Sequence, residues 1–140
     1  MTRILSITIT LALYFNLILV DCNLTIVNLN PDEANLFQKN EIQYSAANFG
    51  QILYGKTLVS KLMIADPSDG CEALKNFNST DSPFILIQRG NCTFVQKVRF
   101  AQLAGASLAI IYDHIEESSD NLVMMADGHS SDITIPSIII

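Results

Sequence analysis

The sequence has few basic residues and few of the side chains on which catalytic and metal sites depend. Its 140 residues include 8 lysines and arginines against 14 aspartates and glutamates, a formal net charge of −6. Such a surface repels nucleic-acid phosphates and anionic lipid head groups, so we expect neither to be the main partner, and nucleic-acid binding in particular is disfavoured. There are two histidines, three cysteines and no tryptophan.

The sequence contains no catalytic or metal-binding motif built from its glycines, histidines or acidic residues. The six glycines are scattered, with no phosphate-binding loop and no Gly-x-Ser-x-Gly nucleophile elbow. His114 and His129 lie in polar stretches and are expected at the surface. The Asp and His residues at 127–132 lack the ligand spacing of a zinc site. The two aspartates at 66–69 lack the alternating carboxylates of a calcium loop, and their segment is typical of a turn. The sequence therefore predicts no catalytic residue, no metal and no cofactor.

A long hydrophobic run is present only at the N-terminus. Arg3 precedes an apolar segment of 17 residues, Ile4 to Val20, which Asp21 and Cys22 follow. One positive charge before such a core is typical of a secretory signal peptide, here cleaved after Cys22. An uncleaved signal anchor is the alternative, because the segment approaches the minimum length for a membrane span. A bacterial lipidation site at Cys22 is disfavoured because Asp21 stands where a small residue is required.

We therefore expect residues 1–22 to be a signal peptide and the remainder to lie on the luminal or extracellular side. Without Cys22, the cysteines Cys71 and Cys92 form an even pair, and an oxidising compartment favours a disulfide between them. Closing a loop of about 20 residues would stabilise the fold by roughly 3 kcal/mol in the chain-entropy model. Two separate thiols are the alternative.

Three Asn-x-Ser/Thr triplets agree with a secretory compartment. Asn78 lies in a polar run and is the preferred glycosylation site. Asn23 would become the first residue after cleavage and Asn91 adjoins the predicted disulfide, so both are poorer acceptors.

The hydrophobic pattern of the first half predicts short strands separated by turns. Strands are expected over residues 23–28, 42–47 and 57–65. Residues 29–40 form a polar linker, and the sequence Asp-Pro-Ser-Asp-Gly at 66–70 predicts a turn.

The second half predicts a strand, a helix and a strand. The apolar runs at 84–88 and 107–112 are typical of buried strands, and 135–140 begins another. Thr93 and Gln96 form a capping box that begins a helix, which Gly105 ends. The helix is expected to pack inward through Phe94, Val98, Ala101 and Gly105, with Lys97 and Arg99 toward solvent. The resulting right-handed βαβ unit indicates an α/β domain with a mixed sheet and few helices.

The segment at 89–106, RGNCTFVQKVRFAQLAGA, resembles the protease-associated (PA) domain. The hallmark of that family is Arg-Gly-x-Cys-x-Phe followed by Lys, an Ala-Gln pair and Ala-Gly-Ala. ANFG at 47–50, YGKTLV at 54–59 and Ile-Pro-Ser at 135–137 also match. The resemblance covers about residues 41–140 and implies a swivelling β/β/α fold. A domain of this type normally continues further, so a C-terminal truncation is expected.

Among PA domains, the sequence is most similar to luminal domains of type I membrane proteins. Two groups share the pattern: vacuolar sorting receptors and PA-transmembrane-RING ubiquitin ligases. The spacing of ANFG and YG favours the receptors, and an accessory domain of a peptidase ranks third. The resemblance implies protein or peptide binding without catalysis in the endosome, Golgi or vacuole/lysosome system. Membrane anchoring is expected through a segment beyond Ile140.

In sorting receptors the Arg-Gly-x-Cys-x-Phe segment contributes to the cargo groove, which implies a peptide-binding site here at Arg89, Gly90, Asn91, Cys92, Thr93 and Phe94. Arg89 offers five donors suited to a peptide carboxylate or carbonyl groups, and Gly90 can expose its backbone amide. Cys92 and Phe94 are equally typical of core residues. Ser60, where relatives often carry glycine, and residues 51–53, where a Pro-containing turn is replaced, depart from the family pattern near this groove.

Overall fold

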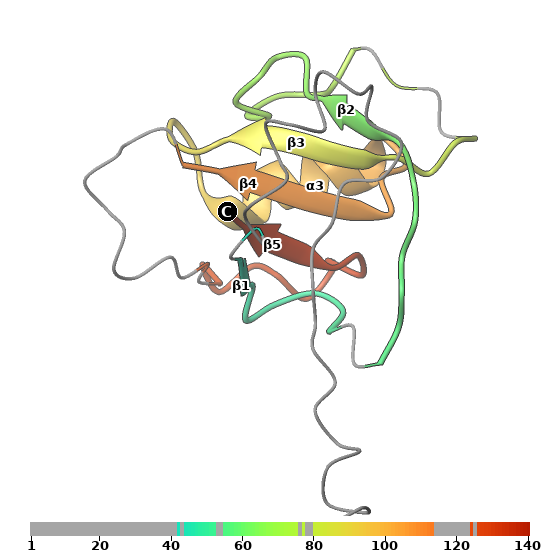
Figure 1. Ribbon diagram of the computed structural model, residues 1–140. Coiled ribbons are helices and arrows are strands. Elements are labelled where there is room, and N and C mark those ends of the chain that lie inside the picture. The colour runs from blue at the N-terminus through green and yellow to red at the C-terminus, as the bar shows by residue number, and fades with distance from the viewer. Residues whose placement is uncertain are drawn as a thin grey trace, which may run out of the picture. The chain divides into compact units, whose positions relative to one another are not determined.

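The computed structural model describes residues 42, 44–52, 55–75, 77, 80–113, 124 and 126–140 (Figure 1). The chain divides between Glu41 and Ile42, and every described residue belongs to Ile42–Ile140. The predicted signal peptide, the strand at 23–28 and the glycosylation sites Asn23 and Asn78 lie outside the described residues.

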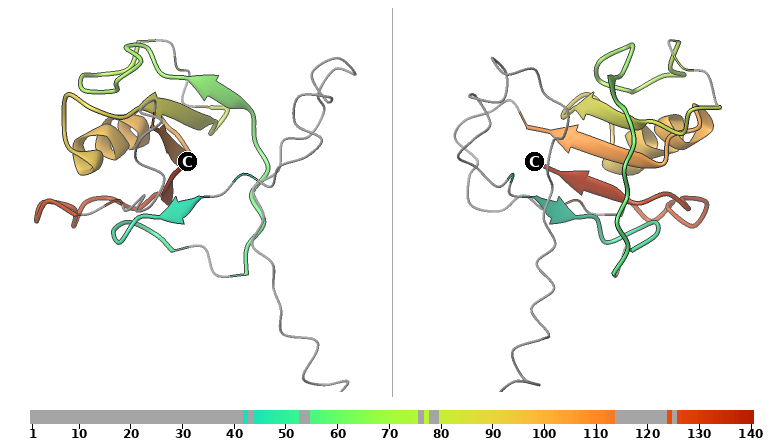
Figure 2. Two further views of the ribbon diagram at one scale, coloured as in Figure 1. Left: turned by 60° about the vertical axis from the view of Figure 1, so that its left-hand side comes forward. Right: turned by 45° about the vertical axis from the view of Figure 1, so that its right-hand side comes forward.

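The described residues form one mixed sheet of five strands in the order β1-β5-β4-β3-β2. The strands are β1 (Ser45–Ala46), β2 (Leu62–Ile64), β3 (Phe84–Gln88), β4 (Leu108–Tyr112) and β5 (Ser137–Ile139). From β2 to β5 the neighbours run parallel, whereas β1 pairs with β5 in the antiparallel sense. Helix α3 (Phe94–Leu103) connects β3 to β4 and lies against one face of the sheet (Figure 2). The predicted α/β class and the βαβ unit are confirmed.

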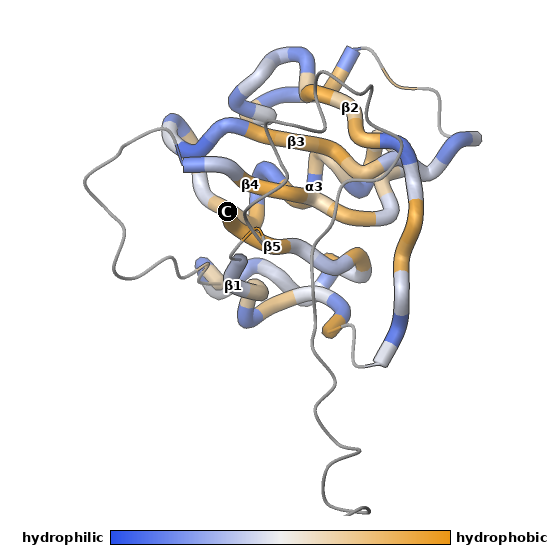
Figure 3. Tube along the Cα trace, in the orientation of Figure 1, coloured by the Kyte–Doolittle hydropathy of each residue, from blue (hydrophilic) through white to orange (hydrophobic). Residues whose placement is uncertain are grey.

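The core lies between this face and α3. In β3, Ile85 and Ile87 are fully buried, and they pair in register with Ala109 and Ile111 of β4. Because successive strand residues point to opposite faces, these four side chains share the helix side. The apolar runs of β3, β4 and β5 are visible along the trace in Figure 3. The cluster comprises Ala47, Phe49, Ala65, Ile85, Ile87, Val95, Val98, Ala101, Ala106, Ala109, Ile111, Met124, Ile133 and Ile139.

Helix α3 begins and ends where its capping residues predict. The Thr93 hydroxyl oxygen accepts a hydrogen bond from the Gln96 amide at 3.2 Å, the first half of the capping box. At the other end Gly105, with φ of +87°, donates its N–H to the Gln102 carbonyl at 3.0 Å, and Ala106 donates to Ala101. This pair of bonds is the Schellman arrangement, which the absent Cβ of glycine permits.

The predicted orientation of Lys97 is wrong. Lys97 has no exposed surface, and Val95 is also fully buried, together with Val98 and Ala101. The pattern was misleading because the segment that follows β2 packs over the first turns of α3 and covers positions that a lone helix would expose.

The predicted strand at 57–65 is shorter than expected. It pairs with β3 only over Leu62–Ile64, and residues 55–59 are exposed. The strand at 42–47 is likewise confined to Ser45–Ala46, with an isolated bridge at Ile42.

The second layer of strands implied by a β/β/α fold is not among the described residues, which contain one sheet and one helix. Within the same ranges, no helix has the length and hydrophobicity needed to cross a membrane.

Substitutions at two glycines would test how closely the segment after β1 packs against the segment before β5. Gly50 has φ of +75°, and a Cβ there would lie 2.5 Å from the Ile135 carbonyl oxygen. Gly128 has φ of +85° but open space around a Cβ. We expect Gly128→Ala to lower the free energy of unfolding by about 1 kcal/mol through backbone strain, and Gly50→Ala by about 3 kcal/mol because the clash adds to it. Equal losses in urea titrations would contradict this packing.

Candidate functional site

Loops from three parallel strands meet at one edge of the sheet. Residues 65–71 follow β2, residues 89–93 follow β3, and Asp113 follows β4. Open α/β sheets bind their ligands outside the carboxyl ends of the strands. Since β2, β3 and β4 are neighbours in chain order, no reversal of strand order opens a crevice here. The loops themselves therefore make the surface.

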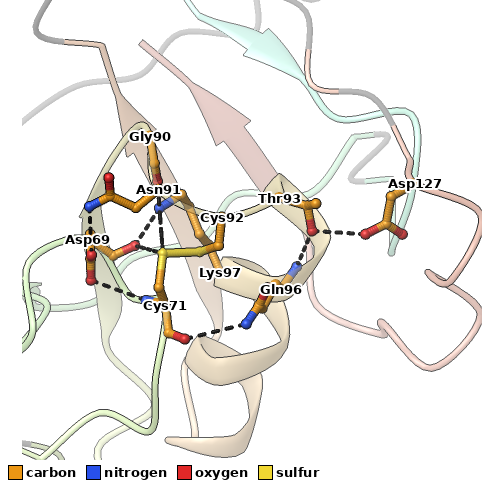
Figure 4. The surroundings of a disulfide bond; sticks show 9 residues. All are labelled: Asp69, Cys71, Gly90, Asn91, Cys92, Thr93, Gln96, Lys97 and Asp127. Carbon is orange, nitrogen blue, oxygen red and sulfur yellow. Dashed lines mark hydrogen bonds between the residues drawn. A yellow bond between two sulfur atoms is a disulfide. The ribbon is translucent and has the colours of Figure 1, made fainter.

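A disulfide joins the first two loops. Cys71 and Cys92 are bonded, with their Cα atoms 5.8 Å apart, so the pairing expected from the sequence is present (Figure 4). Backbone bonds support the same junction, since the Gln88 amide donates to the Ser68 carbonyl at 2.8 Å. The predicted turn at 66–70 is also present, closed by a bond from the Gly70 amide to the Pro67 carbonyl at 3.0 Å. The cross-link thus ties the β2 loop to the start of α3.

Asp69 and Asn91 make the second link between the loops. The Asn91 side-chain amide donates to Asp69 Oδ2 at 2.9 Å, and the Cys71 amide donates to Asp69 Oδ1 at 3.2 Å. These bonds, above all the one from Asn91, hold the pKa of the Asp69 carboxyl below its usual value. Asn91 has φ of +67°, a conformation that asparagine tolerates better than most residues. Asn91 is thereby an organising residue of the loop.

Lys97 lies beneath this junction. Its buried ammonium donates to the Asp69 carbonyl oxygen and lies 3.4 Å from Cys71 Sγ. Burial lowers the pKa of Lys97, and the Asp69 carboxylate partly offsets that shift. Lys97 was not among the predicted site residues because helical periodicity placed it in solvent. The signal that could have identified it was its place in the PA motif.

Arg89 already has partners within the domain. Its guanidinium forms an ion pair with the Asp113 carboxylate and lies 5.9 Å from the centroid of the Phe94 ring. The Arg89 side chain is 40% exposed and that of Asp113 6%. The donor fork expected to face a ligand is therefore partly engaged with Asp113, and Phe94 is packed against the core.

Gly90 and Asn91 form the exposed tip of the 89–93 loop. Gly90 has φ of +107° with open space where a Cβ would be, and the Cys92 amide donates to the Gly90 carbonyl at 2.9 Å. A residue with a side chain would be strained at this φ and would cover the backbone. Of the six predicted site residues, Gly90, Asn91 and Thr93 are exposed. The Asn91 side chain is bonded to Asp69 and the Thr93 side chain to Asp127, whereas Gly90 exposes backbone alone.

The start of α3 is tied to the loop at 126–132. Thr93 Oγ1 donates to Asp127 Oδ2 at 2.8 Å, and the His129 amide donates to Asp127 Oδ1 at 3.0 Å. Arg99 donates through Nε to Asp132 Oδ2 at 2.7 Å.

Gln96, expected to complete the capping box, instead donates to the Cys71 carbonyl at 3.3 Å.

Asp69, Asp127 and Asp132 therefore anchor these loops by accepting hydrogen bonds from other segments. Throughout the ranges that the structure describes, no three His, Cys, Asp or Glu side chains are placed to hold a metal ion. His129 is exposed, as expected, and His114 lies outside those ranges.

A family model described as the PA domain matches residues 55–140. Receptor homology region, transmembrane domain- and RING domain-containing protein 2 of Arabidopsis thaliana is 40% identical over 98 residues, 67% of this chain and 21% of that protein. Vacuolar-sorting receptor 7 of Arabidopsis thaliana is 34% identical over 124 residues, covering 80% and 19%. Signal peptide peptidase-like 5 of Oryza sativa subsp. japonica is 38% identical over 95 residues, covering 62% and 17%.

The chain thus spans between 17% and 21% of the length of these curated relatives. Among solved structures, a zinc aminopeptidase from Bacillus subtilis is similar, with a TM-score of 0.54 and 25% sequence identity. That match covers 71% of this chain and 23% of the other. The similarity agrees with the mixed α/β fold.

The Arg89–Asp113 pair gives a prediction about stability. We expect Arg89→Ala to lower the free energy of unfolding by about 1–3 kcal/mol, because the nearly buried Asp113 carboxylate loses this guanidinium. The comparison variant Arg99→Ala should cost less, because the carboxylate it leaves behind is 54% exposed and regains water, whereas Asp113 is 6% exposed. Urea unfolding of the two variants tests the order, and a larger loss at Arg99 would contradict it.

The Arg99–Asp132 pair gives a prediction about pH. Hydrogen bonds from Arg99 lower the pKa of Asp132 from 3.8 to about 2. A lowered folded-state pKa stabilises the protein above the unfolded value, and that stabilisation is lost as the pH falls from 3.8 toward 2. We expect Asp132→Asn to reduce the pH dependence of stability in this window. A carboxyl resonance of Asp132 titrating near 3.8 in an NMR titration would contradict the pairing.

Proposed function

This chain belongs to the PA domain family, and we propose that it is a non-catalytic luminal module that binds protein or peptide cargo on a receptor of the vacuolar-sorting type. The observation that carries the proposal is the cross-linked pair of loops at the carboxyl edge of the sheet, with an exposed Gly90–Asn91 tip. The proposed contact segment is 89–94.

The arrangement of the loops suits binding more than catalysis. The disulfide, the Asn91–Asp69 bond and the Lys97 contact hold the tip in one conformation before any ligand arrives. A preformed surface loses less conformational entropy on binding, which raises affinity without new contacts. The open backbone at Gly90 and the amide of Asn91 suit hydrogen bonds to the main chain of an extended peptide.

The contacts of Arg89 refine its proposed role. Guanidinium carries five N–H groups, so Arg89 can bond to Asp113 and still direct other N–H groups at a second acceptor. Its 40% exposure leaves room for a second acceptor, such as a peptide carbonyl oxygen. We therefore propose Arg89 as a secondary contact and Gly90 and Asn91 as the primary ones.

The receptor assignment is supported by the extent of the alignment. The match to a vacuolar-sorting receptor runs over 124 residues, whereas the matches to the RING-containing and peptidase-like relatives run over 98 and 95. The predicted secretory leader and the disulfide support a luminal or extracellular location, with Asn78 as the proposed glycan site.

A second candidate is the luminal substrate-recruiting domain of a PA-transmembrane-RING ubiquitin ligase. The 40% identity to the RING-containing relative, against 34% to the receptor, favours it. An accessory domain of a peptidase ranks third, supported by the peptidase-like relative. The sequence of the full-length transcript would separate them: EGF-like cysteine repeats in the same protein would select the receptor, and Cys/His zinc spacing the ligase.

The binding proposal is tested with a random dodecapeptide phage library selected against the immobilised full chain. Asn91→Gly keeps the positive φ but removes the side chain that contacts Asp69. We expect selected peptides to bind this variant at least about tenfold more weakly, a change of about 1.4 kcal/mol.

The control is Leu103→Ala, an exposed change at the opposite end of α3. It should leave binding unchanged, and non-reducing digestion confirms the bridge in each variant. If no peptide is enriched, or if Asn91→Gly binds as well as the parent chain, the proposed surface is wrong.

A further inference from the structure

The two sulfur atoms of the disulfide have different electrostatic surroundings. The Lys97 ammonium lies 3.4 Å from Cys71 Sγ and is fully buried. Within the described ranges, no cation has a corresponding contact with Cys92 Sγ. Both cysteines are partly exposed residues of the surface loops.

We propose that Cys71–Cys92 is a directional site of thiol–disulfide exchange. A small thiolate attacks Cys92 Sγ and forms a mixed disulfide there. The bond to Cys71 breaks, and its electron pair remains on Cys71 as a thiolate beside the Lys97 ammonium. One thiolate is consumed and one is formed, so the step requires no further oxidant, reductant or proton. The better-stabilised thiolate leaves faster, which sets the direction.

Two effects favour the opposite direction of exchange, and the proposal requires that the Lys97 contact outweigh both. Cys92 directly precedes the cap of α3, and a helix N-terminus also stabilises a thiolate, but it acts as roughly half a charge. Lys97 contributes a full charge in direct contact with the other sulfur. The Asp69 carboxylate opposes a negative charge on Cys71, yet hydrogen bonds from Asn91 and the Cys71 amide already occupy it. The balance favours Cys71 as the leaving group.

The structural consequence is local. Exchange would remove the covalent link between the β2 loop and the start of α3, while the bonds from Gln88 to Ser68 and from Asn91 to Asp69 would remain. The 89–93 loop would thus loosen without loss of the sheet. This chemistry does not depend on the proposed peptide binding, although it would alter the same surface.

The experiment follows the position of the mixed disulfide. The oxidised full chain, carrying Cys22→Ser so that two cysteines remain, is treated briefly with reduced glutathione. It is then quenched with acid, alkylated and mapped by mass spectrometry. We expect at least about five times more glutathione on Cys92 than on Cys71. Equal labelling, or a preference for Cys71, would overturn the proposal.

Substitutions show whether Lys97 is the cause. Lys97→Met keeps the length of the side chain without its charge and should reduce the preference to about twofold or less, with slower exchange. Lys61→Met, an exposed change whose charge pairs with Asp81, is the matched control and should leave the ratio unchanged. A preference that persists undiminished in folded Lys97→Met would overturn the assigned role.

A second measurement decides the matter if Lys97→Met does not fold. In the single-thiol variants Cys92→Ser and Cys71→Ser, the thiol pKa is measured from the pH dependence of alkylation. We expect the Cys71 thiol to have the lower pKa of the two, and the reverse order would overturn the proposal. Neither readout involves a peptide, so failure here and failure of the binding proposal are distinguishable.

Discussion

The candidate site depends on the burial of one ammonium group. Lys97 is withdrawn from water on the first turns of α3, and a buried charge of this kind requires a polar partner. The Asp69 carbonyl supplies it, which directs that loop over the helix and leaves the Asp69 carboxylate to accept bonds from Asn91 and the Cys71 amide. The disulfide then closes over the same group. Lys97 itself contacts the Asp69 carbonyl and Cys71 Sγ, and the other bonds of the junction are built around these two.

The sheet determines where this junction lies. Because β2, β3 and β4 are parallel and adjacent, the segments that leave them emerge at the same edge. The apolar residues of β3 and β4 are buried against α3, so the edge is held at a constant position relative to the helix start. Arg89 reinforces it by joining the end of β3 to the residue after β4.

Much of this domain was predictable from local pattern. The strand at 84–88 and the caps at Thr93 and Gly105 follow from hydrophobic runs and capping chemistry, which act over a few residues. The disulfide followed from counting cysteines in an oxidising compartment. What local pattern could not supply was the effect of one segment on another. Gln96 was expected to bond its own helix cap, but the Cys71 carbonyl lies within its reach.

Local pattern was enough to predict the α/β class, the βαβ unit, the turn before Cys71 and the family motif, because each is encoded by residues close together in the chain. Tertiary structure alone decided that Lys97 is buried, that Arg89 pairs with Asp113, and that Gly90 and Asn91 form the open tip. These outcomes arise from contacts between residues more than twenty positions apart, such as Lys97 with Asp69 at a separation of 28. Periodicity describes one element in isolation, whereas burial depends on what packs against it.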